Sequence, residues 1–262
     1  MAITCPIGFD VERLRAQVLA TYDRVARDPG GEFHFHRGAK YAVEFLHYDA
    51  AELAQLPSAC TARFAGVGNP LRIGPVDPGE TVLDHACGGG MDLLLAARRV
   101  GPRGRAIGVD MTPAMRDAAA EAAASAGLAS IVEIRAGVYE QLPVDDQSVD
   151  VVLSNGVVNL APDKGQVFRE IHRVLRPGGR LYLADVIVQR ELKSEVRQNP
   201  DLWAACIGGA LPEPELMELA LEVGFREPRI VERFDCFRDT TAEAKVSRDL
   251  CVHSVNFYCS KP

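Results

Sequence analysis

Residues 81–90 constrain the fold of this chain more than any other segment. Three apolar or β-branched residues lead to Asp84, and a glycine-rich turn then leads into an apolar, helix-like stretch at residues 91–100. A second acid, Asp110, ends a similar run at residues 105–110. Glycine lets the backbone approach a ligand closely, and an acid in the second position can bind both ribose hydroxyls. The pattern therefore predicts two adjacent parallel strands whose ends form a nucleoside pocket.

The remainder of the chain alternates between the two kinds of element. Strands are expected at residues 81–84, 105–109, 131–135, 149–154 and 180–186, and helices at residues 10–28, 91–100, 113–126, 163–175 and 213–223. Such alternation predicts a parallel sheet with right-handed crossovers and helices on both faces. We expect a helical cover at residues 1–75, an α/β core at residues 76–188 and a substrate-side region at residues 189–262 that completes the sheet.

The composition of the 262-residue chain limits its partners. A net charge of −7 without a basic run argues against a nucleic-acid backbone as the main partner. No stretch approaches the roughly 18 uninterrupted apolar residues of a membrane span, and the N-terminus lacks the features of a signal peptide. Seven cysteines without a C-x-x-C pattern are typical of free thiols in a reducing compartment. We therefore expect a cytoplasmic protein that acts on a small molecule, with no nucleic-acid or membrane partner.

The glycine turn also discriminates between nucleoside cofactors. The dinucleotide fingerprint G-x-G-x-x-G places its third glycine on the helix, and Leu93 occupies that position here. The spacing Asp84-x-Ala86-x-Gly88-x-Gly90 instead resembles the first motif of the class I S-adenosylmethionine-dependent methyltransferases, with alanine in the usual first-glycine place. The resemblance implies S-adenosylmethionine as the cofactor and a Rossmann-like, seven-stranded, mostly parallel sheet.

The same resemblance implies which residues would hold the cofactor. The adenine-binding acid of many relatives is absent at Val138, so backbone contacts would serve there, and Tyr139 would close the adenine pocket. The expected cofactor-binding residues are Asp84, Ala86, Gly88, Gly90, Asp110, Met111, Gly137, Val138 and Asn155.

Several further segments resemble the arsenite methyltransferase family. They are residues 108–115, 154–164 and 173–181, together with the connector ending at residues 68–70 and the run at residues 206–211. The string SNGVVNLAPDK at residues 154–164 is the most discriminating of these, and the likeness covers most of residues 50–225. The family binds trivalent arsenic through cysteine thiolates, because arsenic(III) is thiophilic in the way that soft metal ions are.

The substrate site matches the family less completely. Cys206 falls where the family has an arsenic-binding cysteine, whereas Val67 occupies the place of another and residues 33–37 replace a cysteine-bearing loop. The expected catalytic thiols are Cys206 and Cys60, with Cys236, Cys251 and Cys259 as further candidates. The expected substrate-binding side chains are His34, His36 and Trp203, and no metal site is predicted.

Three functions remain open from the sequence. The first is methyl transfer to arsenite or a related soft acceptor, which needs little help from a general base because it is intrinsically nucleophilic. The second is methyl transfer to a small thiol, sulfide or other organic acceptor, which the valine at position 67 favours. The third is a non-catalytic S-adenosylmethionine-binding protein. Residues 29–48 are expected to form a mobile cover over the pocket, and no oligomeric state is predicted.

Overall fold

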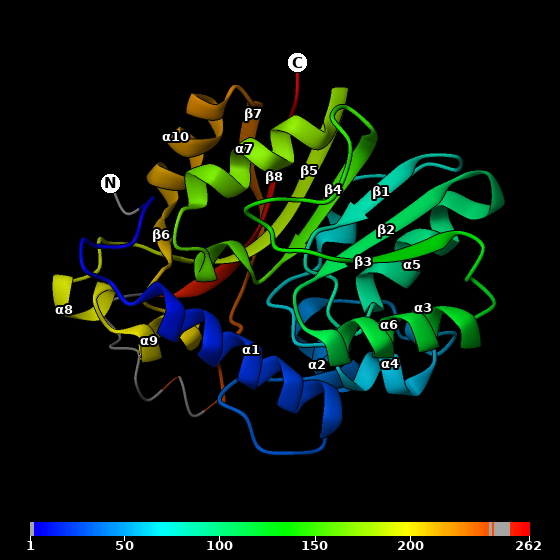
Figure 1. Cartoon of the computed structure of the whole chain (residues 1–262), viewed down its shortest axis with the longest axis horizontal. Coiled ribbons are helices and arrows are strands. Elements are labelled where there is room, and N and C mark those ends of the chain that lie inside the picture. The colour runs from blue at the N-terminus through cyan, green and yellow to red at the C-terminus, as the bar shows by residue number, and fades with distance from the viewer. Residues whose placement is uncertain (1–2, 241–242, 244–251) are drawn as a thin grey trace.

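The computed structural model describes residues 3–240, 243 and 252–262, and Figure 1 shows a central sheet with helices on both faces. Its strands are β1 (Thr81–Asp84), β2 (Arg105–Asp110), β3 (Val132–Ala136), β4 (Val149–Asn155), β5 (Leu175–Val188), β6 (Leu211–Pro212), β7 (Arg226–Phe234) and β8 (His253–Ser260). Its α-helices are α1 (Val11–Arg27), α2 (Gly38–Leu46), α3 (Ala50–Leu53), α4 (Ser58–Ala62), α5 (Met91–Val100), α6 (Pro113–Ser125), α7 (Lys164–Val174), α8 (Ser194–Arg197), α9 (Pro200–Ala204) and α10 (Glu213–Val223).

Seven of the strands follow one another in the order β3-β2-β1-β4-β5-β8-β7, and the two-residue β6 pairs with β5 beside this path. The pairs among β1 to β5 are parallel, whereas β8 runs antiparallel to both β5 and β7. The prediction of a mostly parallel, Rossmann-like sheet is therefore confirmed. The direction of strand progression reverses at β1 and β4, and ligands of such sheets bind beyond the carboxyl ends of the strands at this switch point.

Successive strand residues enter different hydrophobic cores. Val82 and Val151 pack with α5, whereas Leu83 and Val152 pack with α7 and α10 on the other face. The alternation follows from the strand period of two, and burial on both faces explains why β1 and β4 are nearly continuous apolar runs. Because both faces are covered, the polar side chains that end the strands are left to form a site at the sheet edge.

Helix α1 lies across this edge. It begins after Asp10, whose carboxylate accepts a hydrogen bond of 2.9 Å from the backbone N–H of Arg13. Along its length α1 contacts α9 at one end of the site and α6 at the other, as Figure 1 shows. The N-terminal segment therefore closes the switch point from outside.

Helix α2 belongs to the core, and this corrects one expectation. Tyr41, Ala42, Leu46 and Tyr48 are buried in the same cluster as Val82. A cover that moves as one piece over residues 29–48 is therefore wrong for its second half, because moving it would expose these side chains. Removing residues 1–48 is therefore expected to destabilise the fold, because it would take these buried side chains out of the core. The division into three domains stays a prediction.

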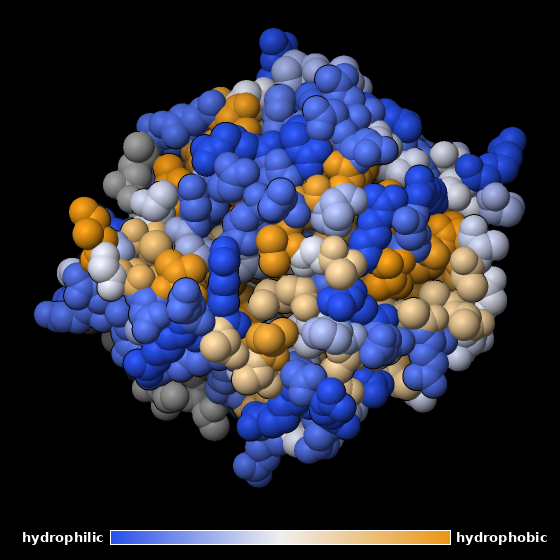
Figure 2. All heavy atoms as spheres, in the orientation of Figure 1, coloured by the Kyte–Doolittle hydropathy of each residue, from blue (hydrophilic) through white to orange (hydrophobic). Residues whose placement is uncertain are grey.

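The outer surface is mostly polar on the face that Figure 2 shows, with apolar side chains in small separate groups. Within the described part of the chain, none of the helices has the length and apolar character that crossing a membrane would require.

Candidate active site

A cavity lies at the carboxyl ends of β1, β2 and β4, and we call it the central cavity. Its empty space, including the part that is open to solvent, is about 860 Å³. Eight of the nine predicted cofactor-binding residues line it, which are Asp84, Ala86, Gly88, Asp110, Met111, Gly137, Val138 and Asn155. Gly90 lies just behind the turn, where it begins α5 in a left-handed conformation with a φ of 89°. The structure thus brings the predicted set together, because parallel strands end at one edge of the sheet.

The glycine turn and Asp110 hold each other in place. The backbone N–H of Gly88 donates to Oδ2 of Asp110 at 2.9 Å, and that of Thr112 donates to Oδ1 at 2.8 Å. Gly88 has a φ of 51°, and a Cβ built there would meet nothing within 4 Å, so the turn leaves open space above it. A carboxylate has about four acceptor sites, so Asp110 can still accept hydrogen bonds from a ligand.

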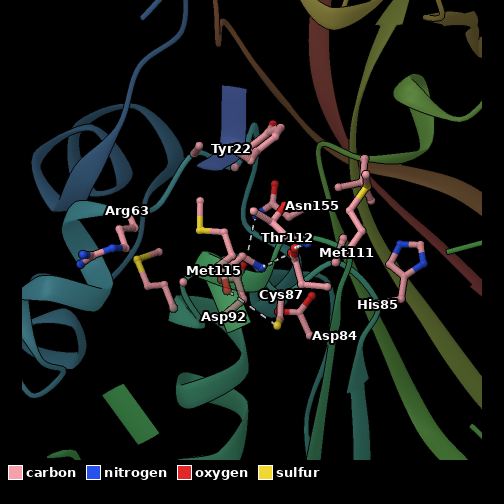
Figure 3. A pocket seen from close by; sticks show the side chains of 18 of the residues that line it. Tyr22, Arg63, Asp84, His85, Cys87, Asp92, Met111, Thr112, Met115 and Asn155 are labelled. Carbon is pink, nitrogen blue, oxygen red and sulfur yellow. Dashed lines mark hydrogen bonds between the residues drawn. The ribbon is translucent and has the colours of Figure 1, made fainter. Parts of the chain in front are cut away.

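Three buried carboxyl groups face the central cavity. Burial, followed by the charge of Asp92, raises the pKa of Asp84 well above its usual range. Burial also raises the pKa of Asp110, and it raises that of Asp92 to about 6. The guanidinium of Arg63 does not offset these charges, because it donates to the carbonyl oxygens of Ala26 and Ala59 and points away in Figure 3. Such a cavity favours a ligand that carries positive charge and hydroxyl groups.

Tyr22 and Asp92 are site residues that the sequence did not single out. Tyr22 reaches the cavity from α1 and lies on the side opposite Asp84 and Cys87 in Figure 3. Asp92 lies in the first turn of α5, where it accepts hydrogen bonds from the Tyr48 hydroxyl at 2.6 Å and from Asn155 Nδ2 at 2.9 Å. Tyr22 occupies an apolar position of an amphipathic helix, and Asp92 lies where an acid is common at the start of a helix. Neither position therefore indicates a binding role from the sequence alone.

A second cavity adjoins the first, and we call it the thiol cavity. Its empty space, including the part that is open to solvent, is about 360 Å³. Tyr22, Ala65 and Gly66 line both cavities. The remaining residues of the thiol cavity are His34, Phe35, His36, Tyr41, Val67, Ala205, Cys206, Cys236 and Phe237. The predicted substrate residues His34 and His36 are therefore brought to the same cavity as Cys206, from segments about 170 positions apart.

The other predicted substrate-site residues lie elsewhere. Cys60 lines the central cavity instead of the thiol cavity. Trp203 lines neither, because its ring packs 4.9 Å from that of Phe9 and its indole N–H donates to the carbonyl oxygen of Arg197 at 2.8 Å. Cys259 is buried in the sheet core, and Cys251 lies outside the described residues. Cys206 and Cys60, the expected pair of catalytic thiols, therefore line different cavities.

A family model described as a methyltransferase domain matches residues 76–233, which contain most of the sheet and the glycine turn. The chain belongs to this methyltransferase family. It is 44% identical over 213 residues to an arsenite methyltransferase of Halobacterium salinarum, covering 81% of this chain and 54% of that protein. It is 39% identical to the human arsenite methyltransferase, covering 57% of this chain and 42% of that protein. The chain thus spans about half the length of these curated relatives.

A solved structure supports the same placement. An arsenic(III) S-adenosylmethionine methyltransferase from Chlamydomonas reinhardtii matches with a TM-score of 0.72 at 36% identity, covering 79% of this chain and 71% of that one. Geranyl diphosphate methyltransferase bound to sinefungin matches at 17% identity, which shows a shared fold alone. The predicted likeness to class I methyltransferases of the arsenite type is confirmed, and S-adenosylmethionine is the cofactor of this family.

The central cavity fits this cofactor by its chemistry. S-adenosylmethionine carries an ammonium and a sulfonium group, which the buried Asp84 and Asp92 would balance. Asp110 would accept from the ribose hydroxyls, as acids at the end of the second strand do in nucleotide-binding sheets. The open space above Gly88 leaves room for a ligand against the backbone.

One prediction concerns Asp92 in the protein without cofactor. Its pKa is raised from 3.8 to about 6, so the unfolded state ionises first as the pH rises, and stability falls between about pH 4 and pH 6. Two units correspond to at most about 3 kcal/mol. Asp92→Asn cannot ionise, so its stability should fall less over this window in urea unfolding. Asp117→Asn on the exposed side of α6 is the control, and equal pH slopes for Asp92→Asn and the unmodified protein would contradict the expectation.

Proposed function

We propose that this methyltransferase transfers a methyl group from S-adenosylmethionine to trivalent arsenic. The observation that supports the proposal is the thiol cavity, which Cys206 lines and which shares Tyr22, Ala65 and Gly66 with the central cavity. Tyr22 connects the two cavities, because its side chain lines both of them. An acceptor held by Cys206 would therefore lie on the far side of Tyr22 from the ribose-binding acid.

Methyl transfer requires little of the protein beyond aligning the methyl donor with the acceptor. Bound S-adenosylmethionine supplies a methyl group that is already activated by the positive sulfur. Arsenic(III) carries a lone pair, so no general base is required to generate the nucleophile. The chain binds the cofactor through its acids, orients the acceptor through a thiol and excludes water with α1.

A panel of acceptors tests the proposal. Labelled S-adenosylmethionine is incubated with the full chain and with arsenite plus excess thiol, sulfide, organic thiols or phenols. We expect label in methylated arsenic products in the arsenite sample. Transfer to an organic acceptor but not to arsenite would replace the proposed substrate, and the lack of turnover with any acceptor would favour a binding protein.

The second candidate is methyl transfer to a small thiol, sulfide or other organic acceptor. Val67 favours it, since an aliphatic side chain lines the thiol cavity where the family has a cysteine. The histidine and aromatic side chains of the same cavity would suit a flat or acidic organic molecule. We also retain the prediction, from the cysteine content, that the protein works in the cytoplasm.

Restoring the family cysteine tests the role of this position. Val67→Cys adds a thiol to the wall of the cavity that holds Cys206, and Val67 is only 9% exposed. We expect it to strengthen arsenite binding by about tenfold or more, which corresponds to one further bond contributing at least about 1.4 kcal/mol. Val144→Cys, at an equally buried site in the sheet core, is the matched control. Equal arsenite affinity for both variants in equilibrium dialysis would show that position 67 does not face the acceptor.

A further inference from the structure

Two thiols from distant parts of the chain share the thiol cavity. Cys206 follows α9, and Cys236 follows β7. They are close enough that the charge of Cys236 contributes to raising the pKa of Cys206. Burial is the largest cause for both, and it raises the pKa of Cys236 to about 12. Both thiols are buried, and their raised pKa values keep them in the neutral form.

The surroundings of Cys206 fix its position. Its backbone has a φ of 62°, in the left-handed region that few residues other than glycine adopt, and its N–H donates to the carbonyl oxygen of Trp203 at 2.8 Å. The Asn159 side chain lies close enough to the thiol to oppose this rise in its pKa. Asn159 is in turn held by Asp185, to which its Nδ2 donates at 2.6 Å and its backbone N–H at 3.1 Å. A strained backbone that such contacts maintain is typical of functional positions.

Cys236 also has a polar neighbour. Ser254 of β8 lies close enough to the thiol to lower the pKa of Cys236. The hydroxyl of Ser254 donates to the carbonyl oxygen of Val67. Position 67 and Cys236 are therefore both neighbours of this one side chain.

We propose that Cys206 and Cys236 together bind trivalent arsenic, with Cys236 supplying the second thiol that position 67 lacks. This rests on the proposed function and names the ligand set of its acceptor site. Two arsenic–sulfur bonds form while two arsenic–oxygen bonds of arsenous acid break, and each thiol proton leaves with a hydroxide as water. No oxidation occurs, and no net charge is created in the cavity. Exchange of this kind suits neutral buried thiols, because nothing has to ionise permanently.

The two histidines line the same cavity as the thiols. His36 is fixed by a hydrogen bond of 2.6 Å between its Nε2 and the carbonyl oxygen of Arg238, two residues beyond Cys236. Its ring lies 4.9 Å from that of Tyr41. The segment that carries Cys236 is thus anchored to the N-terminal segment, and arsenic bound by the two thiols would share its cavity with both histidines and with Tyr22, which also lines the central cavity.

Arsenite binding without cofactor is the direct test. The full chain, Cys206→Ser, Cys236→Ser, Cys236→Ala and the control Cys5→Ser are equilibrated with sodium arsenite, and bound arsenic is counted by mass spectrometry. Cys5 lines neither cavity. We expect one arsenic per chain, a loss of about tenfold or more in affinity for each Cys206 and Cys236 variant, and no change for Cys5→Ser. In the double variant Cys206→Ser/Cys236→Ser, the loss of binding free energy should be smaller than the sum of the losses in the two single variants. The reason is that the two thiols act as one unit.

The outcomes separate this inference from the proposed function. Unchanged affinity in both Cys236 variants, with arsenic still bound by the unmodified chain, would overturn the inference alone. No arsenic binding by the unmodified chain would overturn both. Unchanged S-adenosylmethionine affinity in each variant shows that it is folded, and the alanine variant keeps the site apolar if serine is not tolerated.

Protection from alkylation provides a second readout. Arsenite should protect Cys206 and Cys236 from alkylation but should not protect Cys60. Protection of Cys60 in place of Cys236 would contradict the inference.

Discussion

Replacing Asp110 by alanine is expected to weaken binding of S-adenosylmethionine by roughly 10- to 150-fold. The change removes an acceptor for the ribose hydroxyls, and hydrogen bonds to a charged group contribute about 1.5–3 kcal/mol. It also frees the backbone N–H groups of Gly88 and Thr112, which Asp110 holds at 2.9 and 2.8 Å. The glycine turn therefore loses its anchor together with the ligand contact.

Calorimetry with S-adenosylmethionine and its demethylated product measures this loss. Asp110→Asn keeps one acceptor oxygen, so its affinity should lie between those of the alanine variant and the unmodified chain. Asp117→Asn on the exposed side of α6 should bind normally. If Asp110→Ala binds the cofactor as tightly as the unmodified chain does, Asp110 has no role in holding the ribose.

Replacing Gly209 by alanine is expected to destabilise the fold strongly. A Cβ at this position would fall inside contact distance of the Asn159 carbonyl oxygen and 2.7 Å from Cε3 of Trp203. The backbone oxygen cannot turn aside as a flexible side chain can. Overpacking of this kind costs about 1–3 kcal/mol, and we expect the upper end of that range, which lowers the melting temperature by roughly 4–12 °C.

Gly30→Ala is the matched control, because a Cβ there meets only Asp28 Oδ1 at an ordinary distance of 3.6 Å. The Gly209 variant should also bind arsenite more weakly, since displacing Asn159 disturbs the side chain that contacts Cys206. Equal melting temperatures for the two variants would contradict the close packing of the run at residues 206–211 against Asn159.

The fold and the cofactor site could be predicted because their signals are local. Strand β1 ends in Asp84 and β2 in Asp110, and parallel pairing brings both ends to one edge whatever the rest of the chain does. The two-residue β6 was not predicted, since Leu211 and Pro212 pair with β5 only because tertiary packing places them there. Helix α2 was expected to be part of a cover, and its aromatic side chains are instead part of the core.

The acceptor site was predicted only in part, because it is built from residues that are far apart in the sequence. Nothing in the spacing of Cys206 and Cys236 shows that α9 and the end of β7 meet, whereas Cys60 seemed suitable through its nearness in sequence to Val67. An aromatic residue such as Trp203 commonly lines a substrate pocket. Its ring instead packs against Phe9 and against Lys164, whose Nζ lies 4.3 Å from the ring centre. Tyr22 reaches the border between the cavities only because α1 crosses the sheet edge.

A single-turnover experiment tests the central claim most directly. An excess of the full chain is mixed with one equivalent each of S-adenosylmethionine and arsenite in the presence of thiol, and both products are quantified over time. If the two adjoining cavities hold the cofactor and arsenic, demethylated cofactor and monomethylated arsenic should appear in equal amounts and at the same rate. Demethylated cofactor without methylated arsenic, or intact cofactor although both ligands are bound, would contradict the claim.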